Sequence, residues 1–418
     1  MKTIPFARPY IGKDEEDAVL SVLRSGWLTT GNETIEFEKE FVSFLQNTYT
    51  RSNNEPIFCL AVNSATSGLH LALEALGIKK GDLVLLPSMT FTSTAEVARY
   101  LGAEVVFIDV GKDSFHIDPN ALSETLERLH KGLPAYPSRN GRDEGFGPRG
   151  KAKVIIPVHY GGLPCDMKAI LSIAEKYSLK VVEDAAHCFP SFIQGINNGE
   201  WAGLIGDAGV FSFYATKTLS TGEGGMVVTR DKKIAERIKI MRSHGIDRSI
   251  WNRYIDTKAS WYYEVIEPGF KYNLSDVLAA MGRVQLKRAM DLLSIRRKLA
   301  LFYDKAFKND PHFSIPPTGE GDARHLYPLR LNLEKLSINR DEFAKKIQEN
   351  DIGISVHFIP LHIMPYYKNL YNLEANDLSE TMKSYYRCIS LPLWPGMAEN
   401  ELDRVTSVVK TIASQYTK

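Results

Sequence analysis

Short apolar runs alternate with helical patterns through the middle of this chain, and that alternation most constrains its fold. Seven runs have the length and apolar content of buried strands, at residues 58–62, 83–86, 105–108, 154–158, 180–183, 210–213 and 226–229. Helical patterns separate several of them, for example at residues 166–177, where apolar side chains recur at helical spacing. Alternating strands and helices favour a largely parallel sheet, so we predict an α/β fold.

The chain is long enough for more than one domain. It has 418 residues, of which 44% are hydrophobic and 24% charged, as in ordinary globular proteins. A helical stretch after Leu274 leads toward Arg297, where we expect a change of domain. A strand at 327–333 and a helix at 340–350 follow it. We therefore predict an N-terminal segment (1–30), a large domain (31–296) and a smaller α+β domain (297–418).

Composition excludes several classes of function. The chain carries 51 Lys and Arg against 50 Asp and Glu, so a net charge of +1 gives no field that attracts nucleic acid or an anionic membrane. No apolar run approaches the ~18 residues of a membrane span, and the N-terminus lacks the apolar core of a signal peptide. Cys59, Cys165, Cys188 and Cys388 are scattered singly, without metal-ligand spacing. We expect buried thiols, no metal site and a cytoplasmic location.

Lys217 is the strongest indication of chemistry. It lies between two strand runs in FSFYATKTLSTGEGGMVVT, among small and hydroxyl residues that provide no carboxylate partner. Desolvation at the end of a buried strand favours the neutral, nucleophilic amine that forms a Schiff base with an aldehyde. The alternative is an ordinary loop lysine.

Asp184 and His187 form a second candidate group, in KVVEDAAHC. Asp184 comes at the carboxyl end of a predicted strand, where α/β proteins place their ligands. It can keep a heterocyclic nitrogen protonated, or simply cap the next helix. His187 can hydrogen-bond a ring hydroxyl or pack on a ring, although a lone histidine is more often structural.

Further candidates lie at other predicted strand ends. The turn NSATSGLHLAL offers Thr66, Ser67 and the amides of a helix start to a phosphate, and Ser212 can add a contact. Phe91 follows the strand at 83–86 and can stack on a flat ring or belong to the core. Pyridoxal phosphate (PLP) needs an amine, an acid, a phosphate cup and a ring contact, and this chain has a candidate for each.

In this order, the motifs resemble the nucleotide-sugar aminotransferase family often called the DegT type, of PLP fold type I. The resemblance covers IPFARPYIGKDE, SGWLTTG, NSATSGLHLAL, PSMTFTSTA, VVEDAAH, FSFYATKTLSTGEGGMVVT, PGFKYNLSDVLAAMGRVQL, HFIPLH and ISLPLWPGM. It implies a mostly parallel seven-stranded sheet between helices and a homodimer with active sites at the subunit interface. It also implies roles for individual residues: Lys217 as the cofactor-binding lysine, Asp184 at the pyridine nitrogen, Thr66, Ser67 and Ser212 at the phosphate, Phe91 on the ring and His187 near its hydroxyl.

The chain departs from the family pattern in several places. Many members have asparagine and arginine where GFKYNLSD stands, and that asparagine reaches the neighbouring subunit's phosphate; here Lys271 and Asn273 are the candidates. The stretches 132–150 and 248–266 look longer than the family norm and are candidate borders of the substrate site, although surface decoration is the simpler interpretation of 132–150. Trp27, Thr30 and His362 are further candidate substrate contacts, which structural turns explain nearly as well.

The resemblance implies a ping-pong transamination. An amino donor, expected to be L-glutamate, displaces Lys217 from its aldimine and leaves pyridoxamine phosphate (PMP), which then aminates a nucleotide-linked keto-sugar, expected at C4. Lys217 moves the proton in both halves. Members that dehydrate instead have histidine at the lysine position, so Lys217 favours transamination. The alternatives are a PLP-dependent lyase or dehydratase, and a non-catalytic ligand-sensing protein on the same fold.

Overall fold

The computed structural model describes residues 3–49, 55–141, 144–197, 199–247 and 263–418. Its centre is a sheet in the order β1-β9-β8-β5-β4-β2-β3. The strands are β1 (Phe58–Val62), β2 (Asp82–Pro87), β3 (Glu104–Ile108), β4 (Lys151–Ile155), β5 (Lys180–Asp184), β8 (Ala208–Ser212) and β9 (Gly225–Thr229). Neighbouring strands are parallel except where β9 pairs with β1 and β8. The predicted α/β fold and its seven strands are confirmed.

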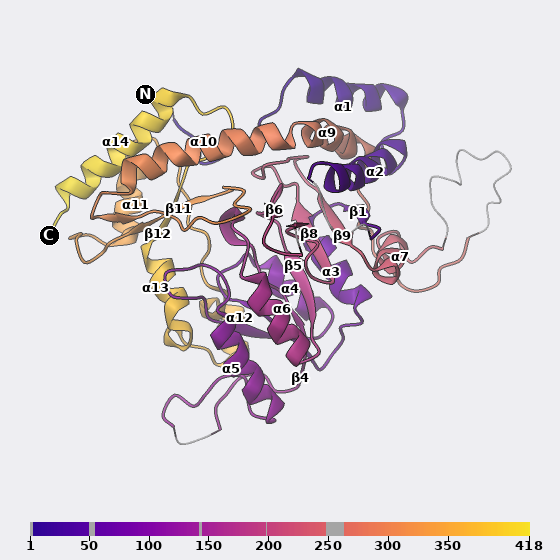
Figure 1. Cartoon of the computed structure of the whole chain (residues 1–418), viewed down its shortest axis with the longest axis horizontal. Helices are drawn as coiled ribbons and strands as arrows, with labels where there is room; N and C mark the ends of the chain where they lie inside the picture. Colours follow the sequence, from indigo (N-terminus) through magenta and orange to yellow (C-terminus); the bar gives the residue numbers. More distant parts are fainter. Residues whose placement is uncertain (1–2, 50–54, 142–143, 198, 248–262) are drawn as a thin grey trace.

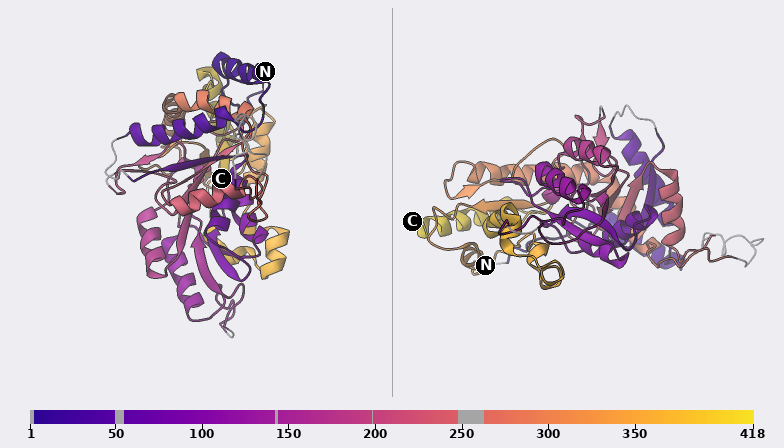
Figure 2. Two further views of the ribbon diagram at one scale, coloured as in Figure 1. Left: turned by 90° about the vertical axis from the view of Figure 1, so that its right-hand side faces the viewer. Right: turned by 90° about the horizontal axis from the view of Figure 1, so that it is seen from below.

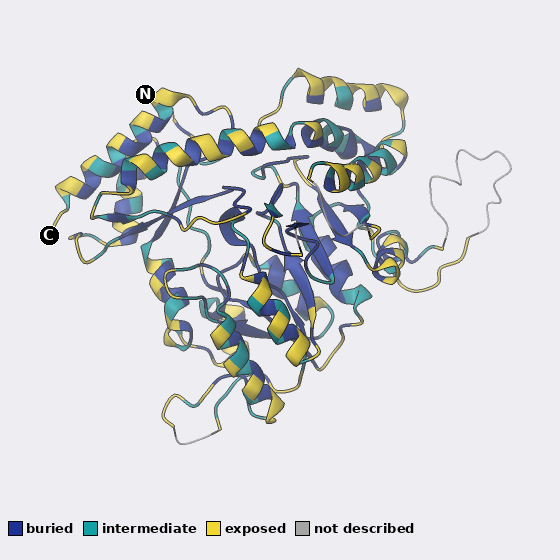
Figure 3. Cartoon of the chain, viewed as in Figure 1, coloured by how far each residue is buried: buried dark blue, intermediate teal, exposed yellow. Residues whose placement is uncertain are grey.

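Helices cover both faces of this sheet (Figure 1). On one face lie α3 (Ala65–Ala75), α4 (Ser93–Tyr100) and α7 (Lys232–Met241). On the other lie α2 (Asn32–Asn47), α5 (Pro119–His130) and α6 (Met167–Lys176). The strands are almost wholly buried and the helices expose only their outer sides, as Figure 3 shows. Because helices shield both faces, the strands read as continuous apolar runs, which is why they were visible in the sequence.

The C-terminal part builds a second layer of structure at one end of the molecule (Figure 2). Its sheet is antiparallel and contains β10 (Phe313–Ser314), β11 (Tyr327–Leu331) and β12 (Cys388–Leu391). Its helices are α11 (Arg340–Gln348), α12 (Pro365–Tyr371), α13 (Ser379–Arg387) and α14 (Glu399–Gln415), with 3-10 turns η2 (Leu361–Ile363) and η3 (Ala375–Leu378). The N-terminal segment joins it, because Ile4 pairs through its backbone with Asp351 and Gly353.

A long helix connects the two parts. The single helical stretch expected after Leu274 is in fact two helices, α9 (Asp276–Lys287) and α10 (Ala289–Phe307), separated at Arg288. Ala289, at the start of α10, packs in the core of the central sheet, whereas Leu299 and Tyr303 pack in the core of the C-terminal sheet. The predicted boundary at 296/297 therefore falls inside α10, and the division into 1–30, 31–296 and 297–418 stays a prediction.

Three smaller elements complete the described chain. The helix α1 (Lys13–Ser25) packs along α9. A short hairpin is formed by β6 (Phe192–Ile193) and β7 (Glu200–Trp201), and the 3-10 turn η1 (Tyr160–Gly162) follows β4. Most of the second candidate insertion, residues 248–262, lies outside the described residues.

Candidate active site

A cavity of about 550 Å³ opens at the carboxyl ends of β5 and β8. Its lining comes from both parts of the chain, including His325, His357 and Leu393 from the C-terminal part and Phe6 and Ala7 from the N-terminal segment. Of the residues predicted from the sequence, it contains Thr66, Phe91, Asp184, His187, Ser212 and Lys217. The structure thus gathers six candidates that are spread over about 150 positions of sequence.

Lys217 lies in the turn between β8 and β9 and is half-buried in the cavity wall. Its backbone N–H donates to the carbonyl of Tyr214 at 2.8 Å, which closes a tight turn directly after the strand. Burial lowers the pKa of Lys217 to about 7, although the negative charge of Asp184 opposes the shift. In a large fraction of the molecules the Lys217 amine is therefore neutral near pH 7. Only the neutral amine can act as a nucleophile or accept a proton.

Asp184 ends β5 and faces the same cavity, with only 6% of its surface exposed. Its Oδ2 accepts a hydrogen bond from Thr94 Oγ1 at 2.7 Å, and its Oδ1 accepts from Ala186 N–H at 3.2 Å. Burial raises the pKa of the carboxyl, and these two donors oppose the shift. Thr94 was missed from the sequence, although Thr90 and Thr94 share one side of the segment that enters α4 and their hydroxyls lie 2.7 Å apart.

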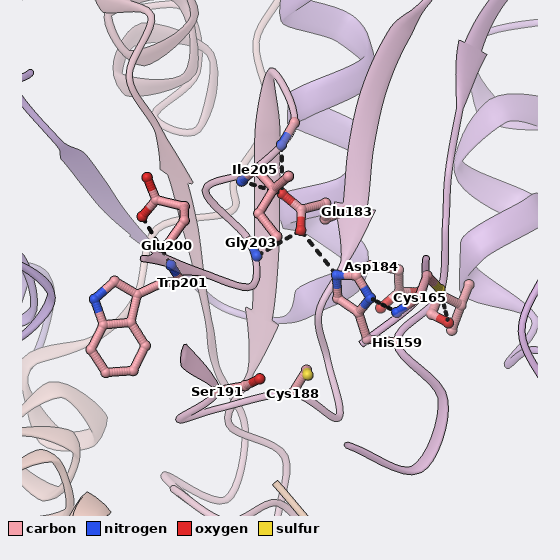
Figure 4. Close-up of polar contacts among 12 residues, drawn as sticks. His159, Cys165, Glu183, Asp184, Cys188, Ser191, Glu200, Trp201, Gly203 and Ile205 are labelled. Carbon is pink, nitrogen blue, oxygen red and sulfur yellow. Dashed lines mark hydrogen bonds and ion pairs between the residues drawn. The ribbon is translucent and has the colours of Figure 1, made fainter. Parts of the chain in front are cut away.

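Glu183, one residue earlier on β5, points to the opposite side of the strand and is fully buried. Its carboxylate accepts four hydrogen bonds: from Gly203, Ile205 and Gly206 N–H at 2.7 to 2.8 Å and from His159 Nε2 at 2.9 Å (Figure 4). Because His159 Nδ1 accepts from Cys165 N–H at 3.1 Å, the imidazole proton resides on Nε2.

This second carboxylate fixes the strand that carries Asp184. Gly203 to Gly206 precede β8, so Glu183 ties the end of β5 to the segment that leads toward Lys217. The backbone of His159 also donates to the carbonyl of Asp184 at 3.1 Å. The layer behind the cavity wall is thus built around Glu183. Its only sign in the sequence is the pair of adjacent acids in VVEDAAH.

The N-terminus of α3 forms one end of the cavity, where Ser64, Ala65 and Thr66 line it. The helix packs so closely on the sheet that a Cβ on Gly225 would lie 2.9 Å from Ala65 N, so only glycine fits there. The partial positive charge of a helix N-terminus, with the nearby hydroxyls, suits a phosphate dianion.

Ser67 differs from the prediction. It is buried, and its Oγ lies 2.7 Å from two acceptors within the capping box, Asn63 Oδ1 and the Ser64 carbonyl. Its hydroxyl is thus engaged inside the helix start and does not line the cavity. Ser64, whose Oγ accepts from Ser67 N–H at 3.1 Å, lines the cavity in its place and was missed within the same motif.

Three more of the predicted residues line the cavity: Phe91, His187 and Ser212. Phe91 is 57% exposed, which is unusual for a phenylalanine and leaves one ring face available for a flat partner. Ser212 ends β8, and its Oγ accepts from Tyr214 N–H at 3.3 Å. His187 Nδ1 accepts from Gly161 N–H at 3.2 Å, so the proton of the neutral ring is on Nε2. Burial holds the pKa of His187 well below its usual range, which preserves this tautomer.

Two further histidines and a phenylalanine line the cavity from the C-terminal part and were not predicted. His325 lies 4.6 Å from His187 between ring centroids, and Phe358 stacks on His187 at 5.9 Å. His357 Nδ1 is 2.8 Å from Ser390 Oγ, and burial lowers the pKa of His357 to about 3. The sequence motif HFIPLH indicates this segment, but the residue predicted from it was His362.

His362 is that residue, and the structure does not bring it to the cavity. Its side chain is fully buried; Nδ1 lies 2.7 Å from Ser88 Oγ and Nε2 lies 3.3 Å from the Ala375 carbonyl. Both ring nitrogens are therefore used to join η2 and η3 to the residue after β2. A direct substrate contact is not open to His362 in this conformation.

Four other candidates form a separate cluster that does not line the cavity: Trp27, Thr30, Lys271 and Asn273. Lys271 Nζ donates to Asn273 Oδ1 at 2.6 Å, and Asn273 Nδ2 donates to Thr30 Oγ1. Trp27 Nε1 donates to the Thr30 carbonyl at 3.4 Å. These four residues do not line the cavity of their own subunit, and their roles toward cofactor and substrate stay predictions.

The candidate insertion at 132–150 does not border the cavity in the part that the structure describes. Tyr136 pairs with Phe146, and Arg139 forms an ion pair with Asp377 at 2.6 Å, so the stretch folds back on α5 and η3. All four cysteines are free and buried, as expected. The described residues contain no group of three or more metal-ligating side chains and no helix fit to cross a membrane.

Comparisons with known proteins agree with this geometry. A model of the DegT/DnrJ/EryC1/StrS aminotransferase family matches residues 9–410. The spore coat polysaccharide biosynthesis protein SpsC of Bacillus subtilis is 40% identical over 414 residues, or 98% of this chain and 97% of SpsC. The Helicobacter pylori aminotransferase PseC, involved in the biosynthesis of pseudoaminic acid, is 27% identical with a TM-score of 0.83, covering 99% of this chain and 100% of PseC.

The cofactor prediction rests on a further structure. Spr1654 of Streptococcus pneumoniae is 28% identical and matches 99% of both chains, with a TM-score of 0.84 for its PMP-form and 0.83 for its PLP-form. Together these matches confirm an aminotransferase, PLP and PMP as its cofactor forms, and the predicted fold type. The chain belongs to the DegT/DnrJ/EryC1/StrS aminotransferase family.

Proposed function

We propose that this chain transfers an amino group from an L-amino acid, L-glutamate in the first instance, to C4 of a nucleotide-linked keto-sugar. The observation that carries the proposal is the arrangement of Lys217 and Asp184 in one cavity with the N-terminus of α3. SpsC and PseC support the sugar substrate, because their names and titles connect them with polysaccharide and pseudoaminic acid biosynthesis.

The cavity residues fit PLP by their chemistry. Thr66, Ser64 and Ser212 with the α3 N-terminus would hold its phosphate, Phe91 would cover one ring face, and Asp184 would hold the proton of the pyridine nitrogen. Bound PLP supplies an electron sink for the carbanion that forms when the α proton of the donor leaves. Gly161 N–H donates to Nδ1 of His187, so the proton of the imidazole is on Nε2. This N–H can donate a hydrogen bond to the oxygen on the ring of PLP.

Lys217 would carry the proton in both half-reactions. Its amine, with a pKa of about 7, accepts the α proton of the amino donor and later delivers a proton to the sugar carbon. Because both steps use one side chain on one face of the site, the keto acid must leave before the keto-sugar enters. This order is the ping-pong scheme.

Trp27, Thr30, Lys271 and Asn273 form a cluster outside this chain's cavity, and we propose that they serve the cavity of a second copy in a homodimer. A cationic Lys271 and a hydrogen-bonding Asn273 suit a phosphate or diphosphate of the neighbouring site. The cytoplasmic location stays a prediction from the sequence.

The test is to convert the enzyme to its PMP-form and incubate it with a panel of nucleotide-linked keto-sugars while the absorbance of the PLP-form is followed. The proposal predicts that a 4-keto-sugar restores the PLP-form faster than a 3-keto-sugar or a simple keto acid other than 2-oxoglutarate. Recovery with simple keto acids and with none of the sugars would remove the sugar assignment.

A further inference from the structure

Arg296, in the middle of α10, is almost completely buried, with 2% of its surface exposed. Its guanidinium donates only to backbone carbonyls: Nη1 to Leu393 at 2.9 Å and to His325 at 3.2 Å, and Nη2 to Thr216 at 3.4 Å. The first two carbonyls belong to the C-terminal part and the third belongs to the turn after β8. One side chain thus joins both parts of the molecule, from the helix α10 that runs from one part to the other (Figure 1).

The three residues whose carbonyls accept from Arg296 all line the cavity. Thr216 is also the residue immediately before Lys217, so the contact acts on the backbone that carries the amine. Arg296 itself does not line the cavity. Its position is therefore behind the wall, where it fixes the segments on either side of Lys217 without contacting a ligand.

The charge of Arg296 has no carboxylate partner among the described residues, and its Nε has no hydrogen-bond partner there. Burial lowers the pKa of Arg296 to about 10, which leaves the group charged near pH 7. An isolated buried cation is costly, and the hydrogen bonds to the three carbonyls offset part of that cost.

The surroundings of Lys217 show what such a charge does. The titratable groups that line the cavity with Lys217 are Asp184 from β5, His187 after it, Tyr214 after β8, Glu223 before β9, His325 before β11 and His357 before η2. Burial keeps the pKa values of His187, His325 and His357 below the neutral range, so these rings add no charge at pH 7. The attraction of Asp184 favours the protonated amine, and Arg296 is the cation that opposes it.

We propose that Arg296 is a positioning residue for Lys217: its hydrogen bonds fix the Thr216 backbone against the C-terminal part, and its positive charge adds to the effect of burial on the amine. The inference rests on the proposed role of Lys217 as the cofactor-binding amine. It adds an origin for the neutrality of that amine, in a residue 79 positions away in the sequence.

The test compares Arg296→Gln, which loses the charge but keeps an amide donor, with Arg296→Lys, which keeps a charge. The control is Arg297→Gln, because the exposed Arg297 also donates to a C-terminal carbonyl, that of Asp322, at 2.8 and 3.0 Å. For each PLP-bound variant, the absorbance of the cofactor is titrated with pH. In the cofactor-free protein, the rate at which a trace amine reagent labels Lys217 is measured against pH by peptide mass spectrometry.

We expect both midpoints to rise by about one pH unit in Arg296→Gln, because removing a nearby positive charge favours the protonated nitrogen. Arg297→Gln leaves them in place, and Arg296→Lys moves them by less than about 0.3 unit. Unchanged midpoints in Arg296→Gln, or an equal rise in Arg296→Lys, would overturn the inference. If Arg296→Gln does not fold, Arg296→Lys decides alone, since a rise near one unit with the charge retained contradicts the role of charge.

Failure of the proposed function has a different signature. A wild-type protein that binds PLP without any change in the reactivity of Lys217 would remove Lys217 from its role. Even then, the pH midpoint of Lys217 labelling in the cofactor-free variants would show whether Arg296 lowers the pKa of the amine.

Discussion

Asp184 and Glu183 are adjacent on β5, yet they belong to two different regions of the molecule. Asp184 faces the cavity, accepts two hydrogen bonds and has a raised pKa because of burial. Glu183 faces away, into a closed layer where four donors surround its carboxylate. The alternation of side chains along a strand separates the two roles by a single residue. Of the two acids, the one with fewer hydrogen-bond donors is therefore the one available to a ligand.

The same contrast applies to the basic groups. Lys217 forms no ion pair with any residue that the structure describes and has a lowered pKa. Lys180, at the start of β5, is exposed and paired with Asp207 at 2.7 Å. The first region is arranged for reaction and the second for stability. Four changes test that division.

Replacement of Lys217 by alanine should have the largest effect. The variant loses both the covalent attachment and the proton carrier, so we expect kcat to fall by about 10⁴-fold or more while PLP still binds without a covalent bond. Steady-state rates and cofactor absorbance measure the two effects. Lys180→Ala is the matched control and should retain activity; retained multiple turnover in Lys217→Ala would remove the lysine from its role.

Asp184→Asn should have the next largest effect. An amide cannot stabilise a proton on the pyridine nitrogen as a carboxylate does, so kcat should fall by about 10³-fold. The folding stability of the cofactor-free variant should equal or exceed that of the wild type, because a buried carboxylate with a raised pKa is replaced by a neutral group. Urea unfolding measures it, and a marked loss of stability would place Asp184 with the structural acids.

Glu183→Gln should show the opposite balance. The amide nitrogen of glutamine meets N–H donors where the carboxylate accepted four hydrogen bonds, so we expect a loss of about 3 kcal/mol in unfolding free energy. The fall in kcat should be only about 10-fold, since the residue acts through the position of Asp184. A loss of turnover as large as that of Asp184→Asn would erase the distinction between the regions.

The smallest effect concerns pH. Lys217 has a pKa of about 7 in the folded chain, well below its ordinary value, so the unfolded chain binds the proton more tightly and stability is lost as pH falls. Between about pH 8.5 and about pH 7, cofactor-free wild type should lose about 1.5 kcal/mol relative to Lys217→Met. Parallel stability curves for the two proteins would contradict the buried, neutral amine.

The parts that the sequence could predict are those encoded locally. All seven central strands were identified because helices bury both of their faces, and Lys217, Asp184, Thr66 and Ser212 were identified because strand-end motifs place them. Thr94, His325 and Arg296 were missed because their roles depend on contacts between segments far apart in the chain. His362 was misplaced for the same reason, since only the fold shows that Ser88 and Ala375 already engage its ring.

The central claim is that Lys217 is the residue to which the cofactor binds. The most direct measurement is to add PLP, reduce the protein with borohydride and locate the modified peptide by mass spectrometry. We expect one stably labelled site, at Lys217 in the turn between β8 and β9. Label on a different lysine, with Lys217 unmodified, would contradict it.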